Sequence, residues 1–174
     1  MELCQASLDK VFLSKEDSKK YCGPLPSAKN LLYQLAIGLE HIHEKELIHR
    51  DLKPENVLIW VSPENGQVLM KWADFGLSKS VNERGTYSMS GIKGTMEWLA
   101  PELLRLLDDA RENEQSESEV RQRGTVKSDV FAEGLIFGYF LLRSLHPFGS
   151  RSKINTNILS NKLVNLKGKS DHSR

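Results

Sequence analysis

The stretch that most constrains this chain is the charged loop at residues 47–56, L-I-H-R-D-L-K-P-E-N. A helical pattern of apolar residues ends just before this loop, and an apolar run that begins at Val57 follows it. Leu47 and Ile48 can bury the entry, which leaves a cluster of charged side chains in a short connection with fixed ends. Loops that packed elements hold in this way place polar groups at a cleft. The sequence therefore predicts a catalytic loop here.

The helix before this loop has a clear start and a clear apolar face. Pro24 and Pro26 precede Ser27, which is a good N-cap. Apolar residues then recur at helical spacing: Ala28, Leu31, Leu32, Leu35, Leu39 and Ile42. Gly38 lies within this pattern at a cost of about 1 kcal/mol relative to alanine, so it predicts close packing against a neighbour. We expect a core helix that ends near His43.

Composition excludes some classes of protein. The 174 residues include 24 basic and 23 acidic side chains, and this net charge of +1 gives no bulk attraction to nucleic acid. The longest apolar stretch, residues 134–142, is too short to cross a bilayer, so we expect no membrane segment. Cys4 and Cys22 lack metal-site spacing and indicate a reduced compartment. His41 and His43 are interpreted as favouring the end of a helix rather than as metal ligands.

Three motifs make the chain resemble the protein kinases. Residues 49–56 fit the catalytic-loop pattern H-R-D-L-x-x-x-N, residues 74–76 are the metal-binding D-F-G, and residues 100–102 are the A-P-E that closes an activation segment. The resemblance implies an α+β fold, mainly α, like the large C-terminal lobe of a protein kinase. A short β-hairpin at residues 57–61 and 68–72 would lie by the cleft. The chain has no glycine-rich loop and no V-A-I-K lysine, so we expect the small lobe to be absent.

The resemblance assigns a role to each charged group of the loop. Asp51 would accept the proton of a substrate hydroxyl, and Lys53 would contact the transferring phosphate. Asn56 and Asp74, at the two ends of the hairpin, would hold Mg²⁺, which takes the rest of its ligands from water and ATP. Lys53 and the pair at residues 94–95 are typical of serine/threonine kinases. A purely structural salt bridge to the preceding arginine is the alternative for Asp51.

The resemblance also places the nucleotide and the regulatory residues. Residues 1–4 would be the end of a strand that leads into a short helix, with the main-chain groups of Glu2 and Cys4 against the adenine of ATP. Residues 74–102 form a long polar segment, in which we expect phosphorylation by a second copy of the protein. The residues assigned to this regulation are Arg50, which would pair with the phosphate, and Thr86, Ser88, Ser90 and Thr95.

The rest of the chain is divided as follows. Residues 1–164 would be the large lobe, with a charged, solvated insertion at about 105–125, and residues 165–174 a disordered tail. A docking site is the alternative for the insertion. Ser128 is predicted to cap a helix that begins near Asp129 and that is apolar around nearly its whole circumference, so we expect it to be buried. A last weak helix is expected at about residues 153–164.

Residues 94–102, 128–131 and 146–149 narrow the resemblance to the inositol-requiring kinase/endoribonucleases that sense endoplasmic-reticulum stress, and to the 2-5A-dependent ribonuclease. This implies a kinase of the unfolded protein response, a homodimer when full length, on the cytoplasmic face with a parent anchored in the endoplasmic reticulum. A pseudokinase or dimerising scaffold, and a cytosolic serine/threonine kinase without a ribonuclease, are the alternatives. We expect this fragment alone to be inactive, with no nucleic-acid contact from this segment.

Overall fold

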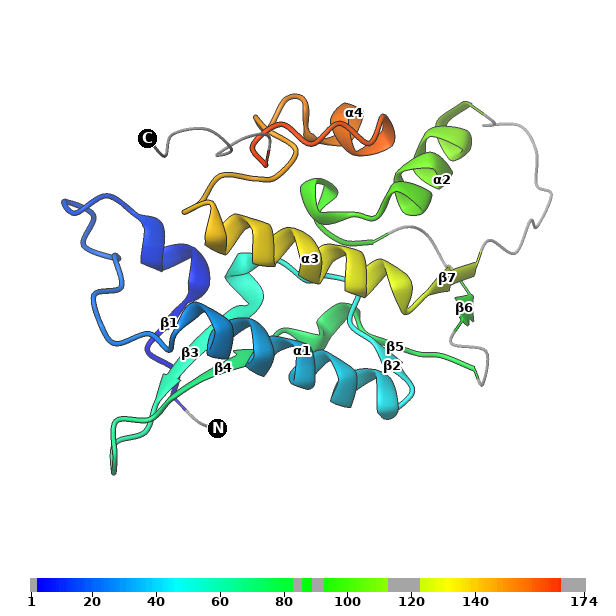
Figure 1. Cartoon of the computed structure of the whole chain (residues 1–174). Helices are drawn as coiled ribbons and strands as arrows, with labels where there is room; N and C mark the ends of the chain where they lie inside the picture. The colour runs from blue at the N-terminus through cyan, green and yellow to red at the C-terminus, as the bar shows by residue number, and fades with distance from the viewer. Residues whose placement is uncertain (1–2, 83–85, 89–92, 113–122, 167–174) are drawn as a thin grey trace, which may run out of the picture.

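The fold stacks helices over a small antiparallel sheet. The computed structural model describes residues 3–82, 86–88, 93–112 and 123–166 (Figure 1). The helices are α1 (Ala28–Glu44), α2 (Pro101–Glu112), α3 (Lys127–Leu141) and α4 (Ile154–Leu159). In Figure 1 the hairpin lies at the lower left, next to the left end of α1, α3 runs above α1, and α2 and α4 lie above α3. The expected α+β, mainly helical class is confirmed.

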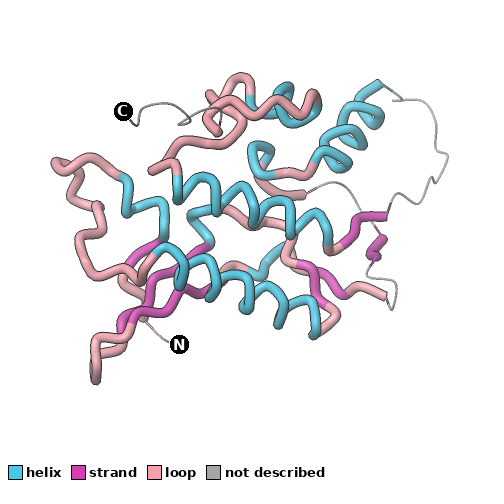
Figure 2. Tube along the Cα trace, in the orientation of Figure 1, coloured by secondary structure: helices cyan, strands magenta, loops and turns pink. Residues whose placement is uncertain are grey.

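The strands are short and antiparallel. They are β1 (Ala6–Ser7), β2 (Leu47–Ile48), β3 (Val57–Val61), β4 (Val68–Trp72), β5 (Lys79–Ser80), β6 (Thr86–Ser88) and β7 (Arg123–Thr125). One sheet has the order β1-β3-β4, and β2 pairs with β5 and β6 with β7 (Figure 2). The hairpin is confirmed with the predicted bounds, since Val57 pairs with Trp72 and Val61 with Val68. Its register fixes the two chain ends that lead into the site.

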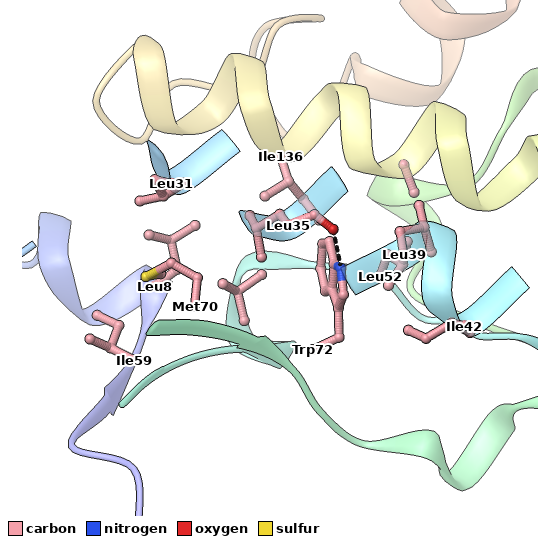
Figure 3. Close-up of a cluster of buried hydrophobic side chains, with 12 residues drawn as sticks. Leu8, Leu31, Leu35, Leu39, Ile42, Leu52, Ile59, Met70, Trp72 and Ile136 are labelled. Carbon is pink, nitrogen blue, oxygen red and sulfur yellow. Dashed lines mark hydrogen bonds between the residues drawn. The ribbon is translucent and has the colours of Figure 1, made fainter. Parts of the chain in front are cut away.

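The main core lies between α1, the hairpin and α3. Figure 3 shows its buried side chains: Leu8, Leu31, Leu35, Leu39, Ile42, Leu52, Ile59, Met70, Trp72 and Ile136. The indole Nε1 of Trp72 donates to the carbonyl of Leu35 at 3.0 Å, which satisfies its polar atom inside the core. A Cβ at Gly38 would lie 3.1 Å from Trp72, so the predicted close packing is confirmed. Ser27 caps α1 as expected, accepting from the N–H of Asn30.

A second apolar cluster lies between α2, α3 and α4. Its buried members are Leu99, Leu103, Leu104, Leu135, Phe148, Ile154 and Ile158. Helix α2 was not predicted, because residues 105–112 were assigned to the charged insertion and residues 123–125 now belong to β7. Helix α2 forms because Leu103 and Leu104 are buried in this cluster while charged residues such as Arg105 stay exposed. Residues 113–122 of the predicted insertion lie outside the described residues.

Helix α3 differs from the prediction in its start and in its burial. The N-cap residue is Val126, and Ser128 lies inside the helix with its hydroxyl donating to the carbonyl of Thr125 at 2.7 Å. Val130 and Leu141 are 54% and 57% exposed, so α3 is open on one side. An apolar circumference therefore did not predict full burial, which depends on what packs around the helix.

The C-terminal helix is shorter than predicted, and residues 165–166, assigned to the tail, are part of the described structure. Helix α4 covers six residues rather than the whole of 153–164. Asn165, assigned to the tail, donates its side-chain amide to the carbonyl of His146 at 2.7 Å, which ties it to the body of the protein. Residues 167–174 of the predicted tail are not described. No helix within the described ranges is long and apolar enough to cross a bilayer.

Candidate active site

The loop at residues 47–56 is anchored by Asp129, in the first turn of α3. Its carboxylate accepts from the backbone N–H of His49 at 2.7 Å and of Arg50 at 2.9 Å, and it also contacts Nε2 of His43 at 3.1 Å. Asp129 is only 2% exposed, so these partners replace the water that an ionised carboxylate would otherwise need. The first turn of α3 thereby holds the loop in one position.

A second set of contacts holds the loop against the end of the hairpin. The ring Nε2 of His49 lies 2.9 Å from the carbonyl of Ala73, and the ring packs against Phe75 at 4.9 Å between centroids. The N–H of Ala73 donates to the carbonyl of Asn56 at 2.9 Å. Residues from either side of the hairpin are therefore joined where the hairpin meets the loop.

Asp51 lies at the centre of the loop, with hydrogen bonds to both of its carboxylate oxygens. Lys53 Nζ donates to Oδ2 at 2.7 Å, and Asn56 Nδ2 donates to the same atom at 3.2 Å. Oδ1 accepts from the backbone N–H of Thr95 at 3.0 Å and from its hydroxyl at 2.8 Å. Lys53 Nζ also contacts the Thr95 hydroxyl at 3.1 Å. The four residues form one closed polar cluster.

These hydrogen bonds determine the charge of the Asp51 carboxylate. Burial acts to raise its pKa, but the hydrogen bonds from Lys53, Thr95 and Asn56 and the charge of Lys53 outweigh that effect, so the pKa lies below its ordinary value. Asp51 is therefore an ionised hydrogen-bond acceptor at neutral pH. A structural pairing with the neighbouring arginine is not what the structure shows for this carboxylate, since its ion pair is with Lys53.

The backbone around the cluster is strained where the loop and residue 94 meet. Arg50 has a φ of 72°, and Asp74 has a φ of 62°, both in the left-handed region that non-glycine residues rarely adopt. Gly94 has a φ of 124°, and a Cβ there would lie 2.7 Å from the carbonyl oxygen of Arg50. Such strain concentrates at functional sites, where surrounding contacts hold it in place. Here it brings Thr95 against Asp51.

Asn56 and Asp74 have donor atoms that fit a magnesium ion. Asn56 uses its amide nitrogen on the carbonyl of Asp51 at 2.8 Å, which leaves its amide oxygen as a donor atom for a cation. Asp74 is exposed and follows Ala73, the residue bonded to Asn56. No group of three or more His, Cys, Asp or Glu side chains that could hold a metal occurs within the described ranges. Two oxygen donors from separate loops suit Mg²⁺, which takes several of its ligands from water and phosphate.

The residues expected at the adenine and in regulation are only partly described. Cys4 is half-buried and lies outside any strand, and it precedes Gln5, whose N–H donates to the carbonyl of Ile59; strand β1 begins at Ala6. Glu2 and Ser90 lie outside the described residues. Thr86 and Ser88 belong to β6, which pairs with β7 instead of remaining in an open loop.

Two contacts of the site were missed from the sequence. Asp129 was noted only as the start of a helix, yet a carboxylate in so apolar a helix must find polar partners, which was the available signal. Thr95 was assigned to regulation, but the structure places it in direct contact with Asp51 and Lys53. No local pattern predicts that contact, because the residues are 44 positions apart.

Known proteins resemble this chain over most of its length. Residues 1–173 match the protein kinase domain family. The chain is 33% identical over 175 residues to the Caenorhabditis elegans serine/threonine-protein kinase/endoribonuclease ire-1, and 36% identical over 162 residues to the human serine/threonine-protein kinase/endoribonuclease IRE2. These alignments cover 95% and 92% of this chain but 16% of each relative. A Schizosaccharomyces pombe sensor for unfolded proteins in the ER, ire1, is 38% identical over 143 residues, which cover 75% of this chain and 13% of that protein.

Proposed function

The chain belongs to the protein kinase family, and we propose that its loop at residues 47–56 transfers a phosphoryl group from ATP to serine or threonine hydroxyls of a protein. The similarity to serine/threonine-protein kinases supports the substrate class. The observation that carries the proposal is the Asp51 carboxylate, held ionised between Lys53, Asn56 and Thr95. Phosphoryl transfer requires mainly positioning and charge neutralisation, and this cluster offers both.

Asp51 would orient the substrate hydroxyl and accept its proton. Each of its oxygens already accepts two hydrogen bonds, so an incoming hydroxyl must displace one donor. Lys53 is the donor best suited to leave, because its side chain is 22% exposed and can turn toward a phosphate. The same movement would free an Asp51 lone pair and bring a cation to the transferring group. Asn56 and the backbone N–H of Thr95 would keep the carboxylate in place.

Asn56 and Asp74 would hold the magnesium ion through their side-chain oxygens. Magnesium and ATP supply the transferable group and neutralise charge on its phosphates. The main-chain groups of Glu2 and Cys4 remain our proposal for the adenine contact. Arg50 would pair with phosphate on Thr86, Ser88 or Ser90 after transfer from a second copy. Mass spectrometry of the active protein checks this, and unmodified residues at all three positions would contradict it.

The relatives that carry the words kinase/endoribonuclease and unfolded-protein sensor support a wider role. We propose that the parent protein acts in the unfolded protein response, dimerises, and presents this segment on the cytoplasmic face of the endoplasmic reticulum. The chain spans about a sixth of the length of these relatives. The endoribonuclease activity in their names is therefore not proposed for this segment. Co-immunoprecipitation of two differently tagged full-length copies, under stress and without it, tests the dimer.

The kinase proposal is tested in two forms of the protein. The 174-residue chain alone should transfer little phosphate, because its sequence contains no glycine-rich phosphate loop. A chimera that adds the nucleotide-binding lobe of the human relative should be active. Asp51→Asn in that chimera should lower kcat by orders of magnitude and leave ATP affinity nearly unchanged.

Glu64→Gln, in the exposed hairpin turn, is the matched control and should behave as wild type. Unchanged kcat in the Asp51→Asn chimera would remove Asp51 from catalysis. Tight Mg-ATP binding with no transfer by the unaltered chimera would favour a scaffold that only binds nucleotide.

A further inference from the structure

A buried histidine outside the polar cluster of Asp51 contacts the segment that carries Thr95. The 3₁₀ turn at Met96–Trp98, hereafter the 96–98 turn, follows Thr95 directly, and the N–H of Trp98 donates to the carbonyl of Thr95 at 2.9 Å. The rings of Trp98 and His146 lie 4.9 Å apart between centroids at an interplanar angle of 65°, an edge-to-face contact. His146 is therefore linked to the Asp51 carboxylate through Trp98 and Thr95.

The partners of the His146 ring show which nitrogen carries its hydrogen. Burial lowers the pKa of His146 to about 4, against the opposing effects of Glu97, so the ring is uncharged at neutral pH and has one N–H. The backbone N–H of Phe148 donates to Nδ1 of His146 at 3.2 Å, which makes Nδ1 an acceptor. The hydrogen is therefore on Nε2.

This Nε2–H donor is buried and has no matched acceptor. His146 is 8% exposed, and its Nε2 has no hydrogen-bond partner among the described residues. A buried donor without a partner is costly, so it persists where another role compensates for it. The groups beside the ring belong to the 96–98 turn: the indole of Trp98 and the backbone of Glu97, which acts on the pKa of His146. The Nε2–H is thus directed to the turn that follows Thr95.

The 96–98 turn has two other supports. Arg151 donates to the carboxylate of Glu97 at 2.6 Å, but the arginine side chain is 89% exposed, and exposed ion pairs contribute little. Tyr139 of α3 lies edge-to-face with Trp98 at 5.8 Å between centroids. Trp98 therefore contacts two rings, one on α3 and one in the segment between α3 and α4. The second ring, His146, is itself held by the N–H of Phe148.

We propose that His146 is a positioning residue for phosphoryl transfer, which holds the 96–98 turn and thereby holds Thr95 against Asp51. Thr95 donates its N–H and its hydroxyl to Oδ1 of Asp51 at 3.0 and 2.8 Å, so a shift of the turn removes two of the donors that fix this carboxylate. A misplacement of about 1 Å in a reacting group can lower a rate by about 10²-fold. The effect on rate rests on the proposed function, whereas the effect on Thr95 does not.

Two substitutions separate the donor of His146 from its acceptor. An asparagine can place its carbonyl oxygen near the position of Nδ1 and keep the bond from Phe148, whereas a glutamine can place its amide N–H near the position of Nε2. We expect His146→Gln to keep Thr95 in place and His146→Asn to release it. A role limited to holding Phe148 predicts the reverse order. His41→Gln and His41→Asn, at an exposed position of α1, are the matched controls and should change neither property.

The first measurement uses NMR of the 174-residue chain at neutral pH. Long-range ¹H–¹⁵N spectra should place the ring hydrogen of His146 on Nε2. The amide of Thr95 should exchange with solvent about tenfold faster in His146→Asn than in the unaltered chain or in His146→Gln. A hydrogen on Nδ1, or equal exchange in all three proteins, would overturn the proposal.

Trp98 supplies a second pair of variants if those at His146 do not fold. Trp98→Phe keeps an aromatic ring against His146, and Trp98→Leu removes it. We expect the amide of Thr95 to exchange faster in Trp98→Leu and to stay protected in Trp98→Phe. Equal protection in both variants would show that the ring contact does not hold Thr95, and would overturn the proposal.

The second measurement is the rate in the chimera that carries the nucleotide-binding lobe. His146→Asn should lower kcat about tenfold and leave KM for ATP within about twofold, because the contact acts on Asp51 rather than on the nucleotide. His146→Gln and both His41 variants should keep kcat within about twofold of the unaltered chimera. An unchanged kcat in His146→Asn would overturn the positioning role. An unaltered chimera that transfers no phosphate would contradict the proposed function instead, and the exchange of the Thr95 amide would still decide whether His146 holds the turn.

Discussion

The first two turns of α3 carry two buried carboxylates with opposite surroundings. Asp129 is 2% exposed and has three hydrogen-bond partners, two of them backbone N–H groups of the loop at residues 47–56. Glu133, four residues on, is 8% exposed and leaves one oxygen without a partner among the described residues. Burial alone therefore does not tell what a carboxylate does. The number of donors around it separates an anchor from a carboxylate with an unsatisfied oxygen.

The difference follows from what each turn faces. Asp129 faces the N–H groups at the end of β2, which a loop with a positive φ at Arg50 turns toward it. Glu133 faces α1, whose backbone groups are used within the helix and whose nearby side chains are mostly acidic or apolar. The carboxylate in the first turn is thus satisfied by the protein itself, whereas the one in the second turn keeps an oxygen without a donor among the described residues.

The largest effect is expected from breaking the anchor. Asp129→Ala leaves the N–H groups of His49 and Arg50 buried and without their acceptor. Unsatisfied buried donors cost about 1–3 kcal/mol each, so the free energy of unfolding should fall by about 3–5 kcal/mol. Urea unfolding followed by circular dichroism measures this. Glu64→Ala in the exposed turn is the control, and a loss below about 1 kcal/mol for Asp129→Ala would show that the loop does not depend on the anchor.

The second prediction concerns how the free energy of unfolding depends on pH. Glu133 and the buried His146 should contribute with opposite signs. The folded pKa of Glu133, about 7, lies above its ordinary value of 4.5, so its contribution to stability is full below pH 4.5 and is lost as pH rises through 7. The loss is up to about 3 kcal/mol. Burial lowers the folded pKa of His146 to about 4 from 6.5, despite the opposing effect of Glu97. Its contribution has the opposite sign, present above pH 6.5 and lost as pH falls through 4.

These opposite slopes partly cancel in the unaltered protein between pH 4.5 and 6.5. Glu133→Gln removes one of them, so its thermal midpoint should rise with pH across this window more steeply than that of the wild type. Midpoints at pH 4.5, 5.5, 6.5 and 8 give the comparison. If the two curves run parallel, Glu133 does not titrate near neutral pH and the contrast with Asp129 weakens.

The local parts of the fold could be predicted from the sequence, because their causes are local. Ser27 begins α1 where a capping side chain follows two prolines, and Gly38 marks the close approach of Trp72. The hairpin has the predicted bounds because two apolar runs flank a turn-rich linker. Asp51, Lys53 and Asn56 come together because the loop that carries them is short.

The remaining parts depend on contacts between distant segments, which no local pattern encodes. Asp129 meets His49 across 80 positions and Thr95 meets Asp51 across 44. Helix α2 extends into a charged run because two leucines near its start are buried by α4 and the preceding segment. Val130 is exposed because nothing described packs on that side of α3. Patterns within one element give its periodicity but not its neighbours.

A third prediction concerns the contact of α3 with Pro147. A Cβ at Gly138 would clash with Cγ of Pro147, so Gly138→Ala forces either the helix or the residues before Phe148 to move. Overpacking of this kind costs about 1–3 kcal/mol. Urea unfolding should show that loss, with the midpoint falling and the slope unchanged. A stability equal to that of the wild type would mean that residues 146–149 adapt without cost.

The smallest expected effect comes from a glycine four residues earlier on the same face of α3 and has the opposite sign. Gly134 lies one turn before Gly138, in the middle of α3, and a Cβ there would meet nothing within 4 Å. Gly134→Ala therefore adds no clash and reduces the backbone entropy lost on folding, which should stabilise the protein by about 0.5–1 kcal/mol. The pair of glycine variants isolates the surroundings, because the substitution and the helix are the same. Thermal unfolding of both proteins at one pH measures the difference. If Gly134→Ala destabilises the chain as Gly138→Ala does, then the surroundings of Gly134 are packed in solution, and the contrast between these two positions along α3 fails.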